Sequence, residues 1–116
     1  MSNPKKVIQD LTEKYQSFQS DLQSAVEARQ KLESQQQENQ SVKKEFELLS
    51  GTANIYKMIG PVLMKQEKSE ATMSVNGRLE FIEKEIKRVE GQISEIQNKA
   101  ESVKSEIINL QSQTAS

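Results

Sequence analysis

Glutamates in the last third of the chain are the residues whose type and spacing come nearest to chemistry. Glu83, Glu85, Glu90 and Glu95 could be proposed as acid–base pairs. The chain has no His and no Cys, so it lacks the commonest general base, the commonest metal ligand and any thiolate nucleophile. We therefore interpret these carboxylates as solvated helix flanks that add small i,i+4 stabilisation. The sequence predicts a non-enzymatic protein without cofactor or metal.

Length and composition restrict the classes of fold and partner. At 116 residues, 34% hydrophobic and 28% charged, the chain fits one domain whose limited apolar surface lies in narrow seams. The net charge is −1, and lysines alternate with glutamates, so no basic stripe is present to bind nucleic acid. No apolar run of signal-peptide length follows Lys5 and Lys6, and no stretch approaches membrane-spanning length. We expect a cytoplasmic protein that binds neither nucleic acid nor membrane.

Apolar residues in the last third recur at alternating steps of three and four, the a/d seam of a coiled coil. The series is Leu79, Ile82, Ile86, Val89, Ile93, Ile96, Ala100, Val103, Ile107 and Leu110. Gly77 and Gly91 fall at outward-facing positions, where each costs about 1 kcal/mol of helix propensity but leaves the seam intact. The spacing predicts a helix over residues 69–112, capped by Ser69, with Ser74 as an alternative start.

The first third repeats this pattern. Its series is Ile8, Leu11, Tyr15, Phe18, Leu22, Ala25, Arg29 and Leu32. After Leu32 the seam turns polar and resumes at Val42 with a slip of three residues, which predicts a locally overwound stammer. Ser50 and Gly51 are typical of a helix C-terminus. The pattern predicts a helix over residues 5–50.

The segment between these helices has a different period. Residues 55–59 and 62–66 are short apolar runs separated by Gly60 and Pro61, and they predict a β-hairpin over residues 55–66. Its apolar residues, which lie on both faces, are Ile55, Tyr56, Met58, Ile59, Val62, Leu63 and Met64. An isolated hairpin is only marginally stable and its free edges pair with other chains, so we assign these residues to assembly.

A hairpin would reverse the chain and make the two seams antiparallel, so the numbers of facing residues must sum to a constant. A sum of 118 pairs Ile8 with Leu110, Leu11 with Ile107, Tyr15 with Val103, Phe18 with Ala100, Leu22 with Ile96, Ala25 with Ile93, Arg29 with Val89 and Leu32 with Ile86. The large Phe18 then faces the small Ala100, and the small Ala25 faces Ile93, as even packing requires. The expected fold is mainly α: a long antiparallel coiled-coil hairpin with a short β-hairpin between the two helices.

The helix ends farthest from the predicted β-hairpin carry additional apolar residues. Val7 and Ile108 lie just outside the seam. With their neighbours they define an apolar tip: Val7, Ile8, Leu11, Ile107, Ile108 and Leu110. Exposed apolar patches usually mark interaction sites. The simpler alternative is incidental aliphatic residues at frayed helix ends.

Residues 55–66, with the sequence Ile-Tyr-Lys-Met-Ile-Gly-Pro-Val-Leu-Met-Lys-Gln, and the following Arg78-Leu79-Glu80-Phe81 segment resemble the signature of β-type prefoldin subunits. The resemblance covers nearly the whole chain. Within that family, residues 28–33 and 42–45 are most similar to a single eukaryotic subunit type. Gln36 departs from the family pattern, which has leucine there, and this weakens the seam at that layer.

The resemblance implies a heterohexamer of two α-type and four β-type prefoldin subunits, in which strand hairpins form the body and coiled coils project from it. It also implies unfolded clients, chiefly actin and tubulin, passed to the cytosolic group II chaperonin without nucleotide hydrolysis. On that basis we assign client contact to the apolar tip. The main alternative is a passive coiled-coil tether or scaffold, which would show the same heptads without needing a strand hairpin.

Overall fold

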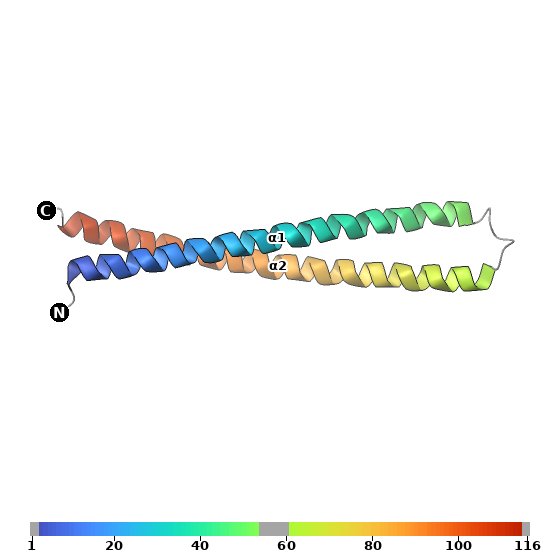
Figure 1. Cartoon of the computed structure of the whole chain (residues 1–116), viewed down its shortest axis with the longest axis horizontal. Helices are drawn as coiled ribbons and strands as arrows, with labels where there is room; N and C mark the ends of the chain where they lie inside the picture. The colour runs from blue at the N-terminus through green and yellow to red at the C-terminus, as the bar shows by residue number, and fades with distance from the viewer. Residues whose placement is uncertain (1–2, 54–60, 115–116) are drawn as a thin grey trace. The chain divides into compact units, whose positions relative to one another are not determined.

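The computed structural model describes residues 3–53 and 61–114, with side chains for residues 3–48 and 68–113, and over these ranges it contains two α-helices (Figure 1). Helix α1 spans Pro4–Ala53 and helix α2 spans Pro61–Thr114. They divide into two compact units: unit 1 takes residues 1–29 and 88–116, and unit 2 takes residues 30–87. Each unit pairs a segment of α1 with an antiparallel segment of α2. The expected helical hairpin is therefore confirmed within each unit.

Helix α1 begins with an N-cap. The backbone N–H of Lys5 donates to Oδ1 of Asn3 over 3.2 Å, and the N–H groups of Lys6 and Val7 donate to the Asn3 carbonyl over 3.0 and 3.1 Å. Asn is among the preferred N-cap residues. Proline lacks a backbone N–H, and Pro4 loses no hydrogen bond because an N–H at the first helical position would have no partner within the helix. The Asn-Pro pair thus sets the start of α1.

The predicted β-hairpin is wrong. Helix α2 begins at Pro61, so Val62, Leu63 and Met64 lie in a helix and cannot form the second strand. Proline suits the first turn of a helix, and the Leu, Met, Lys and Gln that follow are strong helix formers, so local propensity outweighs the short β-branched run. The residues of the first predicted strand lie outside the described part of the chain: Ile55, Tyr56, Met58 and Ile59.

Both helices are longer at this end than their predicted bounds. Helix α1 continues through Ser50 and Gly51 to Ala53, and α2 already includes Ser69 and Ser74, so neither serine caps it. A single glycine costs a helix only about 1 kcal/mol, which is too little to end α1 by itself. Predicted helix ends are generally less certain than the helices themselves.

The α1 seam runs without a slip, so the predicted stammer is also wrong. After Leu32, partial burial recurs at Gln36, Asn39, Lys43 and Phe46, in steps of four and three. Val42, where the predicted slip would place the seam, is 37% exposed. Long polar side chains can bury their aliphatic stems while their polar ends stay in water. Hydropathy alone therefore misplaced the seam, because it treats such residues as outward-facing.

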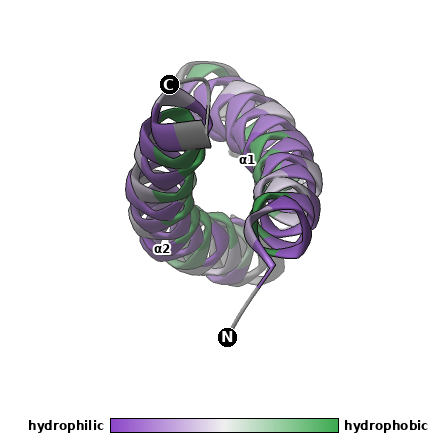
Figure 2. Ribbon diagram, turned by 90° about the vertical axis from the view of Figure 1, so that its left-hand side faces the viewer, coloured by the Kyte–Doolittle hydropathy of each residue, from purple (hydrophilic) through white to green (hydrophobic). Residues whose placement is uncertain are grey.

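The buried core residues of the described side chains all lie on the α2 seam. They are Val75, Ile82, Val89, Ile93, Ala100 and Val103. Figure 2 shows that the apolar sides of α1 and α2 face one another. Residues of the α1 seam are only partially buried, so α1 acts mainly as the cover and α2 supplies the enclosed groups.

The border between the two units lies close to a facing pair of the predicted register. Helix α1 passes from unit 1 to unit 2 after Arg29, and α2 passes from unit 2 to unit 1 at Arg88, one residue from the predicted facing position. Extended into unit 2, the same register sets Gln36 opposite Ile82 and Lys43 opposite Val75. Ile82 and Val75 are both buried. We call Arg29, Gln36 and Lys43, which recur every seven residues opposite buried β-branched residues, the polar row.

Replacing Gln36 with Leu tests the seam position in unit 2. If the side chain at 36 covers Ile82, Gln36→Leu should stabilise the chain by about 1 kcal/mol and raise its melting temperature by roughly 4 °C. Thermal unfolding followed by circular dichroism measures this change. The matched control is Gln37→Leu at an exposed neighbouring position, which should leave the melting temperature nearly unchanged. Equal effects of the two substitutions would contradict the continuous seam.

A cysteine pair tests the register in unit 1. The chain has no native cysteine, so Tyr15→Cys with Val103→Cys should oxidise to an intramolecular disulfide, because facing seam positions bring the two β-carbons close together. Tyr15→Cys with Ile96→Cys, one heptad away, should remain reduced. Non-reducing electrophoresis of the monomeric fraction separates the two products. Equal cross-linking of both pairs would refute the sum of 118.

Candidate functional site

The residues of the predicted apolar tip all lie in unit 1, which contains the start of α1 and the end of α2 (Figure 1). Four of them occupy the seam and are partially buried: Ile8, Leu11, Ile107 and Leu110. Val7 is also partially buried, whereas Ile108 is 54% exposed. The structure thus brings the six residues to one end of unit 1, and Ile108 is the member that offers most free apolar surface.

Val7 and Ile108 lie on opposite flanks of the seam. Val7 precedes a seam residue of α1, and Ile108 follows a seam residue of α2. In an antiparallel pair, the positions that precede the a residues of both helices share one flank, so these two residues are on different sides. The tip is therefore not one flat patch, and a bound segment would contact it from either side.

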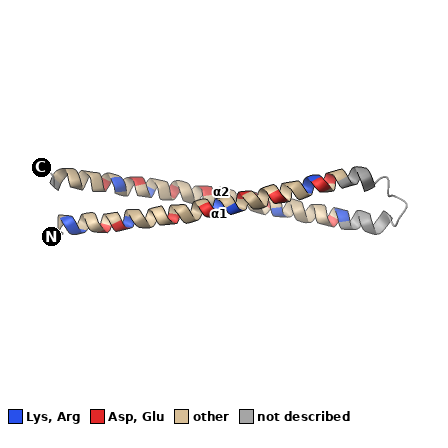
Figure 3. Ribbon diagram, turned by 45° about the horizontal axis from the view of Figure 1, so that its top comes forward, with Lys and Arg blue, Asp and Glu red and all other residues tan. Residues whose placement is uncertain are grey.

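The glutamates considered for chemistry behave as helix flanks. Glu83 pairs with Lys87 over 3.7 Å and Glu95 with Lys99 over 3.1 Å, both at i,i+4 spacing and with all four side chains largely exposed. Glu90 is exposed, and Glu85 is partially buried. Figure 3 shows acidic and basic residues interspersed along both helices. Exposed pairs of this kind contribute only about 0.3–0.5 kcal/mol each to stability.

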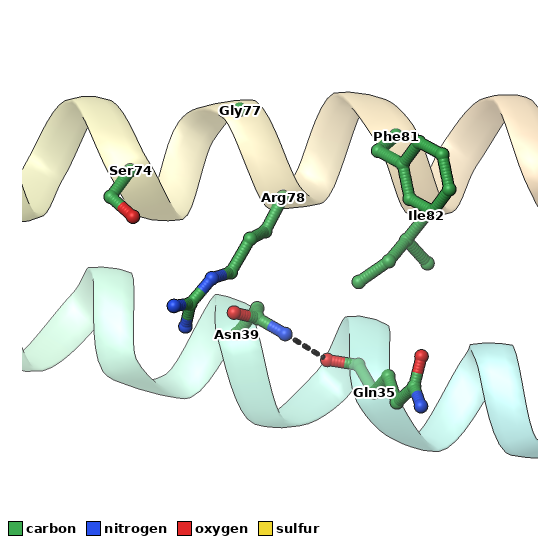
Figure 4. Close-up of a pocket in the computed structure, with 7 residues that line it drawn as sticks. All are labelled: Gln35, Asn39, Ser74, Gly77, Arg78, Phe81 and Ile82. Carbon is green, nitrogen blue, oxygen red and sulfur yellow. Dashed lines mark hydrogen bonds between the residues drawn. The ribbon is translucent and has the colours of Figure 1, made fainter.

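Unit 2 contains a surface groove that the sequence did not predict. It has a volume of about 530 Å³ and is lined by Gln35, Asn39, Ser74, Gly77, Arg78, Phe81 and Ile82 (Figure 4). Gln35 and Arg78 each precede a seam residue, so the groove lies along one flank of the α1–α2 pair. Phe81 is 64% exposed and forms an apolar wall. The groove opens where α1 presents Gln and Asn in place of large apolar side chains.

One polar side chain in the groove is already hydrogen-bonded to the backbone of its own helix. Nδ2 of Asn39 donates to the carbonyl of Gln35 over 2.7 Å, which turns that amide group back onto α1. Figure 4 shows the Arg78 side chain reaching from α2 towards Asn39, while Phe81 stands farther along α2. The sequence signal that would have found the groove is the Arg78–Phe81 spacing combined with polar residues in the facing segment of α1.

Two kinds of feature are absent from the described residues. Neither helix, over 3–53 and 61–114, has a stretch long and apolar enough to cross a membrane. In the same residues, no group of three or more acidic side chains is arranged to hold a metal ion.

Comparison with known proteins identifies the family. Residues 9–114 match the family model described as "Prefoldin subunit". The chain is 46% identical over 107 residues to prefoldin subunit 6 of Saccharomyces cerevisiae, covering 92% of this chain and 94% of the yeast protein. It is 43% identical over 106 residues to prefoldin subunit 6 of Mus musculus, covering 91% of this chain and 84% of the mouse protein. No solved structure matches the chain.

A plant relative extends the same similarity. The chain is 38% identical over 94 residues to prefoldin subunit 6 of Arabidopsis thaliana, covering 81% of this chain and 73% of the plant protein. These relatives agree with the single eukaryotic subunit type indicated by residues 28–33 and 42–45, and they confirm the resemblance seen in the sequence. Members of this family are non-enzymatic chaperone components that assemble with other prefoldin subunits. This chain, with its paired helices and a match over nearly its full length, belongs to the prefoldin subunit family.

Proposed function

We propose that this chain is a β-type prefoldin subunit that binds unfolded proteins at its apolar tip, in a cytoplasmic heterohexamer of two α-type and four β-type subunits. Its clients include unfolded actin and tubulin, which it passes to the cytosolic chaperonin without ATP hydrolysis. Family membership supports the chaperone role, and the resemblance of residues 78–81 to β-type subunits supports the subunit class.

The observation that carries the client-binding role is the exposure of Ile108 beside partially buried aliphatic residues. Aliphatic side chains that pack fully against a partner helix are not free to bind a client, but Ile108 keeps 54% of its surface exposed. Val7, on the other flank, adds a partially exposed β-branched group. An unfolded protein exposes apolar side chains in no fixed geometry. A surface that binds it therefore needs small apolar contacts that can be reached from several sides.

The chemistry of the tip suits reversible capture. Each aliphatic side chain contributes about 1.5–3 kcal/mol when a partner buries it fully, and less in a shallow contact. One tip would therefore hold a client weakly, while several subunits acting together would raise the apparent affinity through multivalency. Weak individual contacts allow release without an energy source, which agrees with a chaperone that hydrolyses no nucleotide.

The double substitution Val7→Ser with Ile108→Ser tests the tip. Assembled complexes carrying it should retain their helical content but suppress aggregation of unfolded actin less well, because the substitution removes apolar contact area outside the seam. The loss should be larger when the tips of neighbouring subunits are also shortened, since multivalency then no longer masks it. Light scattering of diluted, denatured actin measures the suppression.

The matched control is Val26→Ser with Met73→Ser. It also removes one partially buried valine and one exposed apolar side chain, since Met73 is 72% exposed, but neither residue belongs to the tip. This control should suppress aggregation as well as the unmodified complex does. Equal activity of the tip variant and the control, with assembly confirmed for both, would reject the tip as the capture surface.

Native mass spectrometry of the endogenous complex tests the assembly. If the chain is a β-type prefoldin subunit, it should be found in a compact particle of six subunits, two α-type and four β-type. A passive tether would instead be recovered as a filament or as a lone elongated dimer. Recovery in either of those forms would contradict the chaperone assignment in favour of the scaffold alternative.

A further inference from the structure

We propose that the groove of unit 2, lined by Gln35, Asn39, Arg78 and Phe81, binds client segments in which a large apolar side chain lies next to a carboxylate. This inference rests on the proposed chaperone function and adds a chemical preference to it. The recognising groups are the Arg78 guanidinium and the Phe81 ring, which occupy neighbouring turns of the same face of α2.

Arg78 supplies the charge complementarity. Among the residues that the structure describes, no hydrogen bond or ion pair engages its guanidinium, and Figure 4 shows the side chain lying in the groove. A guanidinium carries five N–H donors in a planar fork that matches the two oxygens of a carboxylate. The nearest polar group shown, the Asn39 amide, already donates from Nδ2 to α1 and brings no negative charge to neutralise the arginine.

Phe81 and Ile82 supply the apolar part of the groove. Phe81 leaves 64% of its surface uncovered, while Ile82 is buried and forms part of the floor. A large aliphatic or aromatic side chain seated against Phe81 would lose its contact with water and leave its neighbouring residue within reach of Arg78. Both groups therefore recognise one short segment.

The composition of this face favours a short unfolded segment over a helix from another subunit. A docked helix needs apolar residues at every turn, at spacings of three and four. The corresponding stripe along α2 reads Ser74, Arg78, Phe81, Glu85 and Arg88, with a single large apolar residue. One apolar residue beside one cation is enough to contact a peptide of a few residues. A docked helix would find no apolar contact along most of its length.

Two fluorescein-labelled peptides test the preference. One has a central Phe-Glu-Leu in a Gly-Ser background, and the other has Gln in place of Glu. Fluorescence anisotropy with complexes purified from cells that carry the chain should show roughly fivefold tighter binding of the Glu peptide at low salt, because an exposed ion pair contributes up to about that factor. The preference should shrink as salt is added. Equal affinity for both peptides at low salt would overturn the proposal.

Substitutions in the groove assign the two parts of the preference. Arg78→Gln should abolish the difference between the peptides, whereas Phe81→Ser should weaken both by a similar factor. Retention of the Glu preference in Arg78→Gln would overturn the role of Arg78. If either variant is instead lost from the complex, the groove is an interface between subunits and the proposal fails.

Glycine provides a matched steric control. A β-carbon at Gly77, within the groove, or at Gly91, outside it, would meet no atom within 4 Å, so leucine can be placed at either position without a clash at that atom. Gly77→Leu places a bulky side chain at the outer edge of the groove and should weaken both peptides, while Gly91→Leu should change neither. Equal effects of the two leucines would overturn the assignment of binding to the groove.

The tip variant separates this inference from the proposed function. Val7→Ser with Ile108→Ser leaves the groove intact and should keep the full preference for the Glu peptide. Loss of aggregation suppression in the tip variant, combined with no Glu preference in the unmodified complex, would overturn the groove alone. Normal suppression by the tip variant, combined with a clear Glu preference, would reject the tip and support the groove.

Discussion

The seam between α1 and α2 is the interaction on which the rest of this structure depends. A chain that is only 34% hydrophobic and is 28% charged, with few aromatic residues, has little apolar surface, so it must concentrate burial along one line. Buried β-branched residues and one alanine on α2 form that line, and α1 covers them. The seam repeats every seven residues, and this spacing fixes which residues of each helix face inward.

The polar row explains how the seam stays closed where α1 lacks apolar residues. Arg29, Gln36 and Lys43 recur at one heptad position, and the predicted register sets them opposite the buried residues Val89, Ile82 and Val75. In that register, the methylene groups of the long side chains would cover these apolar residues. Polar residues at such positions lower stability but specify register and partner. A subunit whose two helices must pair with each other, and which then assembles with other subunits, gains from that specificity.

Two other polar residues of α1, Gln35 and Asn39, border the groove of unit 2. Gln35 and Asn39 do not fill the flank of the seam as leucine would, so Phe81 of α2 stays exposed beside Arg78. In unit 1 the end of the seam farthest from unit 2 is apolar, and the free surface there belongs to aliphatic residues such as Ile108. The two units therefore offer different chemistry: an apolar end in unit 1, and in unit 2 an apolar wall next to Arg78, which no described residue neutralises. An unfolded protein carries segments of both kinds.

Heptad spacing in the sequence was sufficient to predict that the chain forms two helices and that Ile82, Val89, Ile93, Ala100 and Val103 of α2 face inward. The antiparallel pairing was inferred instead from the chain reversal of a β-hairpin that does not form, and the predicted seam omitted Val75, which is also buried. The motifs at residues 55–66 and 78–81 were sufficient to indicate the family, because their residue types and order are specific even though the β-hairpin inferred from the first motif was wrong. Only the structure decided that Pro61 starts a helix, since strand and helix propensities over five residues differ by less than the gain from extending a long helix. It also decided that Lys43, not Val42, lies in the seam, and that Arg78 and Phe81 border a groove. These features depend on how a long side chain folds against the opposite helix, and the hydropathy of a single residue carries no such information.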